Sequence, residues 1–388
     1  MKENVYINTP EGFDCLNDKF LKLKKAIYGL KQSAYEWNDM ISNTLLELNF
    51  VQCKSDYCVF VYNVDETVAY IVVYVDDILI MSNNDTFINS VVDEVGRRFK
   101  IKDLGNISNF LGIHIEYDRS NRTIKLSQHS AIEGLLNRFN MVNCKLVDTP
   151  IEKGLKLEIN NSDTEITTQP YKQLLGSLMY IMLGTRPYLC FSISYFSQFQ
   201  AKPTDEHFKY LKRVLRYLAK TINCCLVYDN ENNVLIEGYS DADFANGSDR
   251  RSISGGLVRV FGGTVFWKSK KQPMVTLSST AAEYVALSEL TCQILNMRNF
   301  LSEIGYDINV PICIYEDNIS CIHLAKKFKN KSRCKYLDLK YSFVHEQVTL
   351  FKTIELKYCE SKNMIADMFT KGLNKTDFCR FVKELNLL

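Results

Sequence analysis

The sequence predicts a multidomain protein of mixed α+β and α/β class, built from three consecutive segments. Residues 1–118 contain short apolar runs rich in β-branched and aromatic residues, which is typical of an antiparallel sheet packed with helices. In residues 119–230 the apolar side chains follow a mostly helical spacing. In residues 231–388 expected strands and helices alternate, which predicts an α/β pattern of five strands with helices.

Composition and charge limit the possible functions without identifying one. With 388 residues and 46% hydrophobic side chains, the chain is long enough for two or three domains with their own cores. The net charge of +2 does not indicate nucleic-acid binding, so such a function must rest on local basic clusters. The thirteen cysteines contain no Cys-x-x-Cys pair, which argues against a disulfide framework and a zinc site. No leader and no apolar run of membrane-spanning length is present, so we expect a soluble protein without a membrane partner.

A pair of adjacent acids lies in the most clearly patterned part of the first segment. Residues 68–73 and 78–81 predict two strands on either side of Tyr74-Val75-Asp76-Asp77, and residues 58–62 predict a third. Residues 33–48 follow a helical apolar stripe that we expect to pack against these strands. Two ionised carboxylates side by side repel each other, so their placement is favourable when they share a cation, usually Mg²⁺. The alternative interpretation is an ordinary surface turn.

The third segment places an acid on each of four elements. Five strands, at residues 234–240, 254–260, 264–268, 311–315 and 354–358, are expected together with a helix at 280–304 and a last helix after the fifth strand. The four acids are found at the end of the first strand, in the first turn of the long helix, after the fourth strand and in the last helix: Asp241, Glu283, Asp317 and Asp367. Their placement predicts a shared site.

Three of these acids also have another explanation. Glu283 follows Thr280 by three residues, which is the spacing of a helix capping box. Asp243 could take the role of Asp241, and Asp367 taken alone is compatible with a surface acid. The joint placement favours the shared site over these separate explanations.

The first acidic pair resembles the Tyr-x-Asp-Asp motif of reverse transcriptases, in the Tyr-Val-Asp-Asp form of copia-type LTR retrotransposons. Further elements occur in the family's order: residues 25–32 (Lys-Ala-Ile-Tyr-Gly-Leu-Lys-Gln), Trp37, residues 103–105 (Asp-Leu-Gly), 110–113 (Phe-Leu-Gly-Ile) and 126–128 (Leu-Ser-Gln). The resemblance implies the C-terminal portion of a Pol polyprotein, with a partial palm at 1–118, a thumb and connection at 119–230 and a ribonuclease H-like domain at 231–388. It also implies that Asp76 and Asp77 belong to the polymerase site, with Asp76 as a metal ligand.

Residues 1–13 are similar to the family segment that immediately follows the first polymerase aspartate. The resemblance therefore implies that this aspartate and the fingers are missing, so we expect no RNA-directed DNA polymerase activity from this chain alone. The missing N-terminal half of Pol, supplied as a separate chain or in a longer precursor, would restore that activity. The family also implies a location in the cytoplasm within a virus-like particle, in the nucleus, or in both.

The third segment resembles ribonuclease H, which copia-type elements carry after the polymerase, and the resemblance implies a mixed five-stranded sheet with helices. The resemblance implies that the four acids Asp241, Glu283, Asp317 and Asp367 bind two Mg²⁺ ions, with Mn²⁺ as an alternative, and cut the RNA strand of RNA/DNA hybrids. Tyr336 and Ser342 stand where the family often has histidine. A histidine that helps product release is therefore either lost or moved to His345.

Binding an RNA/DNA hybrid or a primer–template requires contacts to phosphates. Three basic clusters are the candidates, on the helical stretch 209–220 (Lys212, Arg213 and Arg216), in residues 268–272 (Lys268, Lys270 and Lys271), and in residues 326–340 (Lys331, Arg333 and Lys335). For the helical stretch, a solvated surface is the alternative interpretation. A different class of function also fits the sequence, namely a decayed or co-opted nucleic-acid-binding protein that keeps the fold without catalysis.

Overall fold

The computed structural model describes residues 4–10, 20–27, 29–160, 166–229, 234–247, 249–327 and 335–387. The side chains of Lys31, Lys335, Tyr336 and Leu337 lie outside this description. By its contacts the chain divides into two compact units. The first is Met1–Gly105 with Asn299–Asp307, and the second is Asn106–Arg298 with Ile308–Leu388.

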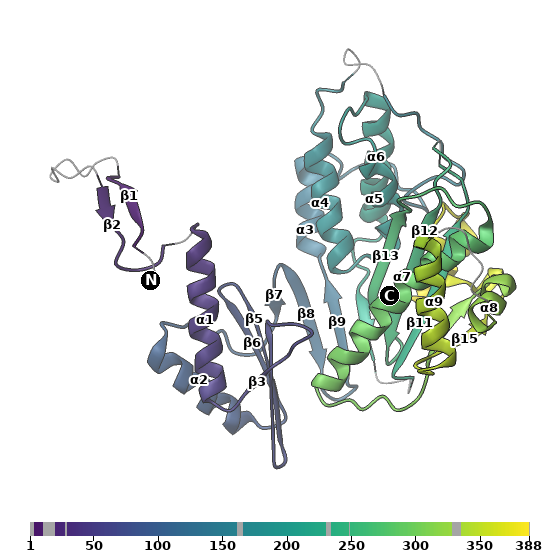
Figure 1. Cartoon of the computed structure of the whole chain (residues 1–388). Coiled ribbons are helices and arrows are strands. Elements are labelled where there is room, and N and C mark those ends of the chain that lie inside the picture. Colours follow the sequence, from purple (N-terminus) through teal and green to yellow (C-terminus); the bar gives the residue numbers. More distant parts are fainter. Residues whose placement is uncertain are drawn as a thin grey trace. The chain divides into compact units, whose positions relative to one another are not determined.

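The first unit is built on a four-stranded antiparallel sheet in the order β3-β4-β5-β6 (Figure 1). Its elements are β3 (Val51–Gln52), β4 (Val59–Val64), β5 (Thr67–Tyr74), β6 (Asp77–Ser82), α1 (Lys31–Glu47) and α2 (Asp85–Arg98), beside a separate pair, β1 (Tyr6–Asn8) and β2 (Phe20–Lys22). Ile41 of α1 and Val91 of α2 pack with Phe60 and Ile71 on one face of the sheet. The antiparallel sheet and the helix expected from the sequence are therefore present.

The second unit contains a small antiparallel sheet that the sequence did not predict. Its order is β10-β9-β8-β7, made of β7 (Asn109–Phe110), β8 (Ile113–Asp118), β9 (Thr123–Ser127) and β10 (Leu226–Tyr228). Asp118 holds the turn between β8 and β9 because its carboxylate accepts hydrogen bonds from the backbone of Ser120 and Asn121. The boundary expected at residue 118 falls inside this hairpin. Segment 119–230 thus begins and ends with strands, although helices dominate between them.

The helices between β9 and β10 share a core with the C-terminal sheet. They are α3 (His129–Arg138), α4 (Tyr171–Gly184), η1 (Pro187–Leu189), α5 (Cys190–Ser197) and α6 (Asp205–Lys220). Tyr188 of η1 contacts the ring of Phe378 edge-on at 6.2 Å between centroids, and one apolar cluster includes Leu215 of α6 together with Leu257 and Phe369. This compact unit therefore spans the boundary expected at residue 230.

The C-terminal sheet has five strands in the order β13-β12-β11-β14-β15. They are β11 (Ile236–Asp243), β12 (Ile253–Val260), β13 (Gly263–Lys271), β14 (Ile312–Glu316) and β15 (Ile354–Tyr358). The first three pair antiparallel, whereas β14 pairs parallel with β11 and β15 pairs parallel with β14. The mixed five-stranded sheet expected from the sequence is therefore present.

Helical elements pack on both faces of this sheet, and small residues allow them to come close. The elements are α7 (Ser279–Glu303), α8 (Ile319–Lys326), α9 (Lys335–Thr349), η2 (Ser361–Asn363), η3 (Ile365–Phe369) and α10 (Lys375–Glu384). A methyl group at Gly238 of β11 would lie 2.6 Å from Ile294 Cδ1 of α7. On the neighbouring strand, a methyl group at Gly255 of β12 would lie 2.6 Å from Thr370 Cγ2, just after η3. In the described part of the chain, no helix has both the length and the apolar character needed to cross a membrane.

Candidate metal centre

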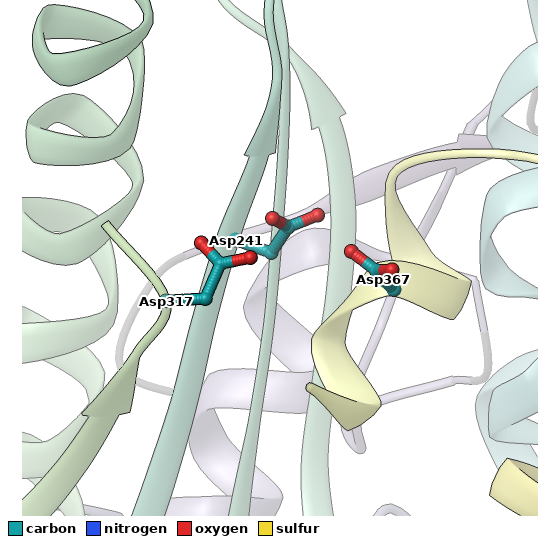
Figure 2. A group of neighbouring side chains, drawn as sticks. All are labelled: Asp241, Asp317 and Asp367. Carbon is teal, nitrogen blue, oxygen red and sulfur yellow. The ribbon is translucent and has the colours of Figure 1, made fainter. Parts of the chain in front are cut away.

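Three carboxylates from distant parts of the sequence meet beside the central strand of the C-terminal sheet (Figure 2). Asp241 lies in β11, Asp317 directly follows β14, and Asp367 lies in η3. Because β11 and β14 are parallel neighbours with Ser240 opposite Glu316, Asp241 and Asp317 leave the sheet side by side. One carboxylate oxygen of each of the three acids lies within 4.8 Å of the others. The structure therefore brings three of the four expected acids into one group.

Local contacts hold Asp241 and Asp367 in place. The absence of a side chain at Gly255 lets the chain after η3 approach β12, as described above, so that the Thr370 hydroxyl donates a hydrogen bond to Asp241. Lys371 Nζ lies 2.7 Å from Asp367 Oδ1. The segment after η3 thus contributes a hydroxyl and an ammonium group to the acidic group.

Glu283, the fourth expected acid, belongs to a second group with Glu316 and Asp317, whose oxygens also lie within 4.8 Å of one another. Its carboxylate accepts a hydrogen bond from the backbone of Ala242. Gln272 Nε2, at the end of β13, donates to the carbonyl oxygen of Ala282 at 2.9 Å and so holds the first turn of α7 against the sheet.

The capping-box alternative for Glu283 is wrong. The helix begins at Ser279, and the hydroxyl oxygen of Ser278 accepts a hydrogen bond from the backbone N–H of Ala281 at 3.2 Å. Ser278 therefore caps the helix before Thr280 is reached. Glu283 instead lies in the second turn, where its side chain faces β11.

Two further expectations change in detail. β11 continues through Asp241 to Asp243, because Asp243 still pairs with Ile253 of β12. The Asp243 carboxylate accepts a hydrogen bond from Asn246 at 2.6 Å, and among the described residues it belongs to neither acidic group. Asp367 lies in a short 3-10 helix and not in a longer α-helix.

Glu316 is a fifth acid that the sequence analysis missed. It is the last residue of β14 and is 0% exposed. Its Oε1 accepts a hydrogen bond from the backbone N–H of Asn318 at 3.3 Å, whereas its Oε2 has no hydrogen-bond partner among the described residues. The only sequence signal was an acid directly before Asp317. The strand period of two places neighbouring side chains on opposite faces, so this signal alone does not indicate that both acids belong to one site.

Burial dominates the electrostatics of the two groups. Burial, and then the negative charge of Asp367, raise the pKa of Asp241 to about 7. Burial and neighbouring acids also raise the pKa of Glu283 and of Glu316. The pKa of Asp367 is raised by burial, although the ammonium group of Lys371 opposes the rise. Without a cation, these carboxyl groups therefore hold protons at a higher pH than exposed acids would.

The donor set fits a hard divalent cation. All candidate ligands are carboxylate oxygens, which Mg²⁺ and Mn²⁺ accept. Glu283 Oε2 and Glu316 Oε2 are buried and lack a hydrogen-bond partner among the residues that the structure describes. Buried carboxylate oxygens are costly to leave unpaired, and a bound cation would satisfy both.

The acidic pair of the first unit has a different environment. Asp76 and Asp77 are both exposed at the tip between β5 and β6. Trp37 Nε1 of α1 donates to the carbonyl oxygen of Val75 at 2.6 Å and fixes this tip, where Val75 adopts a left-handed backbone with φ of 51°. Within the described ranges, neither aspartate belongs to a group of three or more potential metal ligands.

The basic face of α6 contacts the protein itself, which differs from the expected phosphate contacts. Arg213 donates to the carbonyl oxygen of Thr149 at 3.2 Å and lies 2.8 Å from Glu152 Oε1. Arg216 Nε donates to the carbonyl oxygen of Lys145 at 2.6 Å. These groups fix the segment from 145 to 152 on the helix. The charge of Arg213 is thus paired with Glu152, whereas Arg216 donates to a neutral carbonyl oxygen.

The remaining basic candidates are divided between paired and exposed positions. Lys212 lies over the ring of Phe208, Lys268 pairs with Glu289 at 3.0 Å, and Lys271 pairs with Asp249 at 2.9 Å. Lys270 is exposed at the end of β13. Three candidates lie outside the description, wholly or in their side chains: Lys331, Arg333 and Lys335.

The replacement histidine considered for product release is half-buried and contacts a neighbouring helix. His345 Nδ1 lies 2.7 Å from the carbonyl oxygen of Ala325, so it links α9 to the end of α8. Ser342 lies in the same helix α9, and the side chain of Tyr336 is outside the described residues. This contact gives His345 a structural partner.

Comparison with known proteins identifies the class of the chain. A family model described as reverse transcriptase (RNA-dependent DNA polymerase) matches residues 1–153. The retrovirus-related Pol polyprotein from transposon TNT 1-94 of Nicotiana tabacum is 34% identical over 98% of this chain, which covers 29% of that protein. A transposon Ty5-1 protein of Saccharomyces cerevisiae is 31% identical over 76% of this chain, which covers 96% of it.

The chain belongs to the family of copia-type retrotransposon Pol polyproteins and contains part of the reverse transcriptase region. It spans less than a third of the plant Pol polyproteins that it matches, for example 26% of the one from transposon RE1 of Arabidopsis thaliana. Among solved structures, LC11-RNase H1 aligns with 35% of this chain and 93% of its own at 18% identity, with a TM-score of 0.28. This score is too low to carry a conclusion, so the C-terminal layout rests on the strand order and acids described above.

Proposed function

We propose that this chain acts as a divalent-metal-dependent ribonuclease H that cuts the RNA strand of RNA/DNA hybrids, as part of a copia-type Pol protein. The observation that carries the proposal is the convergence of Asp241, Glu283, Asp317 and Asp367 beside the central strand of a mixed five-stranded sheet, in two groups that share Asp317. The family membership supports a nucleic-acid substrate. The buried carboxylate oxygens without partners support cation binding.

The residues of the proposed site have different roles. Asp317 belongs to both acidic groups, so it can contact two cations at once. Ser361 donates a hydrogen bond to Asp317 Oδ2 at 2.7 Å and fixes this shared carboxylate, while Thr370 fixes Asp241. These acids would hold two cations, which when bound would supply an activated water and a positive charge near the leaving 3′-oxygen. The chain contributes the orientation of the ligands and the charge balance from Lys371.

The proposal also concerns the polymerase activity of this chain. A polymerase of this class needs a further carboxylate beside the hairpin acids, and none joins Asp76 and Asp77 among the described residues. We therefore expect hybrid cleavage without nucleotide incorporation from this chain alone. Other Pol domains are the expected partners, because the related Pol polyproteins are more than three times as long.

One observation favours the non-catalytic alternative. The histidine expected to help product release is absent at Tyr336 and Ser342, and His345 is bound to α8. This alternative predicts that the chain binds hybrids equally well with and without Mg²⁺ and does not cleave them.

Cleavage of an end-labelled RNA/DNA hybrid tests the proposal. We expect the unmodified chain to cut the RNA strand with Mg²⁺ and to leave duplex DNA intact. Asp317→Asn should lower the rate by more than about a hundredfold, since even outer partners of metal ligands contribute about 10 to 100-fold. Glu355→Gln is the matched control, because Glu355 is exposed on β15 and pairs with Lys357. Hybrid binding by the unmodified chain without cleavage would favour the non-catalytic alternative.

A further inference from the structure

Glu316 is not one of the four acids that the family resemblance implies, yet one of its carboxylate oxygens lies within 4.8 Å of oxygens of two of them, Glu283 and Asp317. It closes β14, and Asp317 follows it at once. In the sheet, Glu316 stands opposite Ser240 of β11 and Tyr358 of β15. Both neighbouring strands thus flank it, and burial leaves its side chain 0% exposed.

The alternation of side chains along β14 explains how two consecutive acids serve different cations. Tyr315 stacks on Tyr239, with ring centroids 4.7 Å apart, so these rings share one face of the sheet. Glu316 therefore points to the opposite face, where α7 packs. There its carboxylate meets Glu283, while Asp317, at the strand end, reaches both acidic groups.

A purely structural role does not satisfy the Glu316 carboxylate. One oxygen accepts a single, long hydrogen bond of 3.3 Å from Asn318. The other is buried and has no hydrogen-bond partner among the described residues. The nearby ammonium group of Lys371 pairs with Asp367, in the other group. In its charged form, a buried acid next to two further acids is unfavourable unless a cation joins them.

We propose that Glu316 is a metal ligand, and that Glu283, Glu316 and Asp317 together hold one divalent cation while Asp241, Asp317 and Asp367 hold the other. This inference deepens the proposed function and rests on its assumption that the acids bind cations. The site would then contain five carboxylates, with Asp317 shared. The added carboxylate increases the affinity of the cation beside α7 in particular.

Mn²⁺ binding measured by electron paramagnetic resonance of the free ion tests this assignment without any substrate. We expect two Mn²⁺ ions on the unmodified chain. Glu316→Gln, which keeps the shape and removes the charge, should weaken one of the two by about 10 to 100-fold, the range found when groups around a metal are altered. Asp367→Asn should weaken the other ion instead, and Asp317→Asn should weaken both.

Two controls keep the test decisive. Glu355→Gln removes an exposed acid of β15 and should leave both Mn²⁺ affinities unchanged. Glu316→Asp keeps the charge on a shorter side chain and should retain more affinity than Glu316→Gln. Circular dichroism confirms that each variant is folded, and if Glu316→Gln does not fold, the comparison of Glu316→Asp with the unmodified chain decides instead.

The outcomes separate this inference from the proposed function. If Glu316→Gln binds both Mn²⁺ ions as the unmodified chain does, Glu316 is not a ligand, even where hybrid cleavage is observed. If Glu316→Gln loses one ion while the unmodified chain cleaves no hybrid, the metal site stands and the ribonuclease function falls. Binding of a single ion to the unmodified chain would overturn the two-site assignment.

Discussion

The two acidic clusters of this chain differ in what surrounds them. Asp76 and Asp77 stand in solvent at a hairpin tip, whereas Asp241, Glu283 and Glu316 are at most 6% exposed. Water solvates the first pair at little cost, but burial makes each charge of the second cluster expensive. The charged form of the buried cluster is therefore stable only with a counter-charge from within the fold or from bound cations. The exposed pair needs no such counter-charge.

The largest expected difference between the clusters is in stabilisation by Mg²⁺. A ligand at about 100 times its dissociation constant stabilises a folded protein by about 2.7 kcal/mol. We expect Asp317→Asn to remove most of this gain, and Asp77→Asn to retain it, in thermal unfolding with and without Mg²⁺. Equal losses in the two variants would remove the distinction between the clusters.

A smaller effect should follow from disturbing the approach of η3 to β12. Gly255→Ala places a methyl group 2.6 Å from Thr370 Cγ2, so we expect a loss of about 1–3 kcal/mol in the free energy of unfolding together with weaker Mn²⁺ binding. Gly134→Ala is the matched control, because a methyl group there meets nothing within 4 Å. In helix α3 it should stabilise by about 0.5–1 kcal/mol. Chemical denaturation of both variants measures these changes.

The pH dependence of stability should reveal the buried cluster. The pKa of Asp241 is raised in the folded state, from 3.8 to about 7, by burial and then by Asp367. Its contribution to the stability of the metal-free protein is therefore fully present below about pH 4 and is lost as the pH rises through about 7. Bound Mg²⁺ requires deprotonated ligands, so its stabilising effect should grow over the same range. A Mg²⁺ effect independent of pH would contradict burial of the ligands.

The smallest expected effect concerns the basic face of α6. Arg213→Met removes the contacts with Thr149 and Glu152, and we expect a loss of about 1 kcal/mol in the free energy of unfolding, since the ion pair is partly exposed. Hybrid affinity and its dependence on salt should not change. A salt dependence reduced by about one phosphate contact would instead restore the phosphate-binding interpretation of this helix.

The sequence predicted those features that depend on local pattern. The strands around Asp76 and the five strands of the C-terminal sheet follow from their apolar runs. The acids Asp241 and Asp317 follow from their place after the expected apolar runs, although β11 continues past Asp241. Glu316 could not be assigned, because alternation along a strand separates it from Asp317 until the packing of α7 is known.

Features that depend on contacts between residues far apart in the sequence could not be predicted from the sequence either. The hydrogen bonds of Arg213 and Arg216 go to residues more than sixty positions earlier in the chain, and no local spacing indicates such contacts. β10 likewise forms only because it pairs with β9, about a hundred residues before it. For the same reason, the shared core of the helices and the C-terminal sheet was not visible in the sequence.

We expect the buried acids to bind cations and the exposed pair Asp76 and Asp77 not to bind them. The most direct test of this account is an anomalous difference map from crystals of the unmodified chain soaked in Mn²⁺. The account predicts two peaks in the C-terminal sheet, one among Asp241, Asp317 and Asp367 and one among Glu283, Glu316 and Asp317, with none at Asp76. A peak at the Asp76 hairpin, or no peak beside the buried acids, would contradict it.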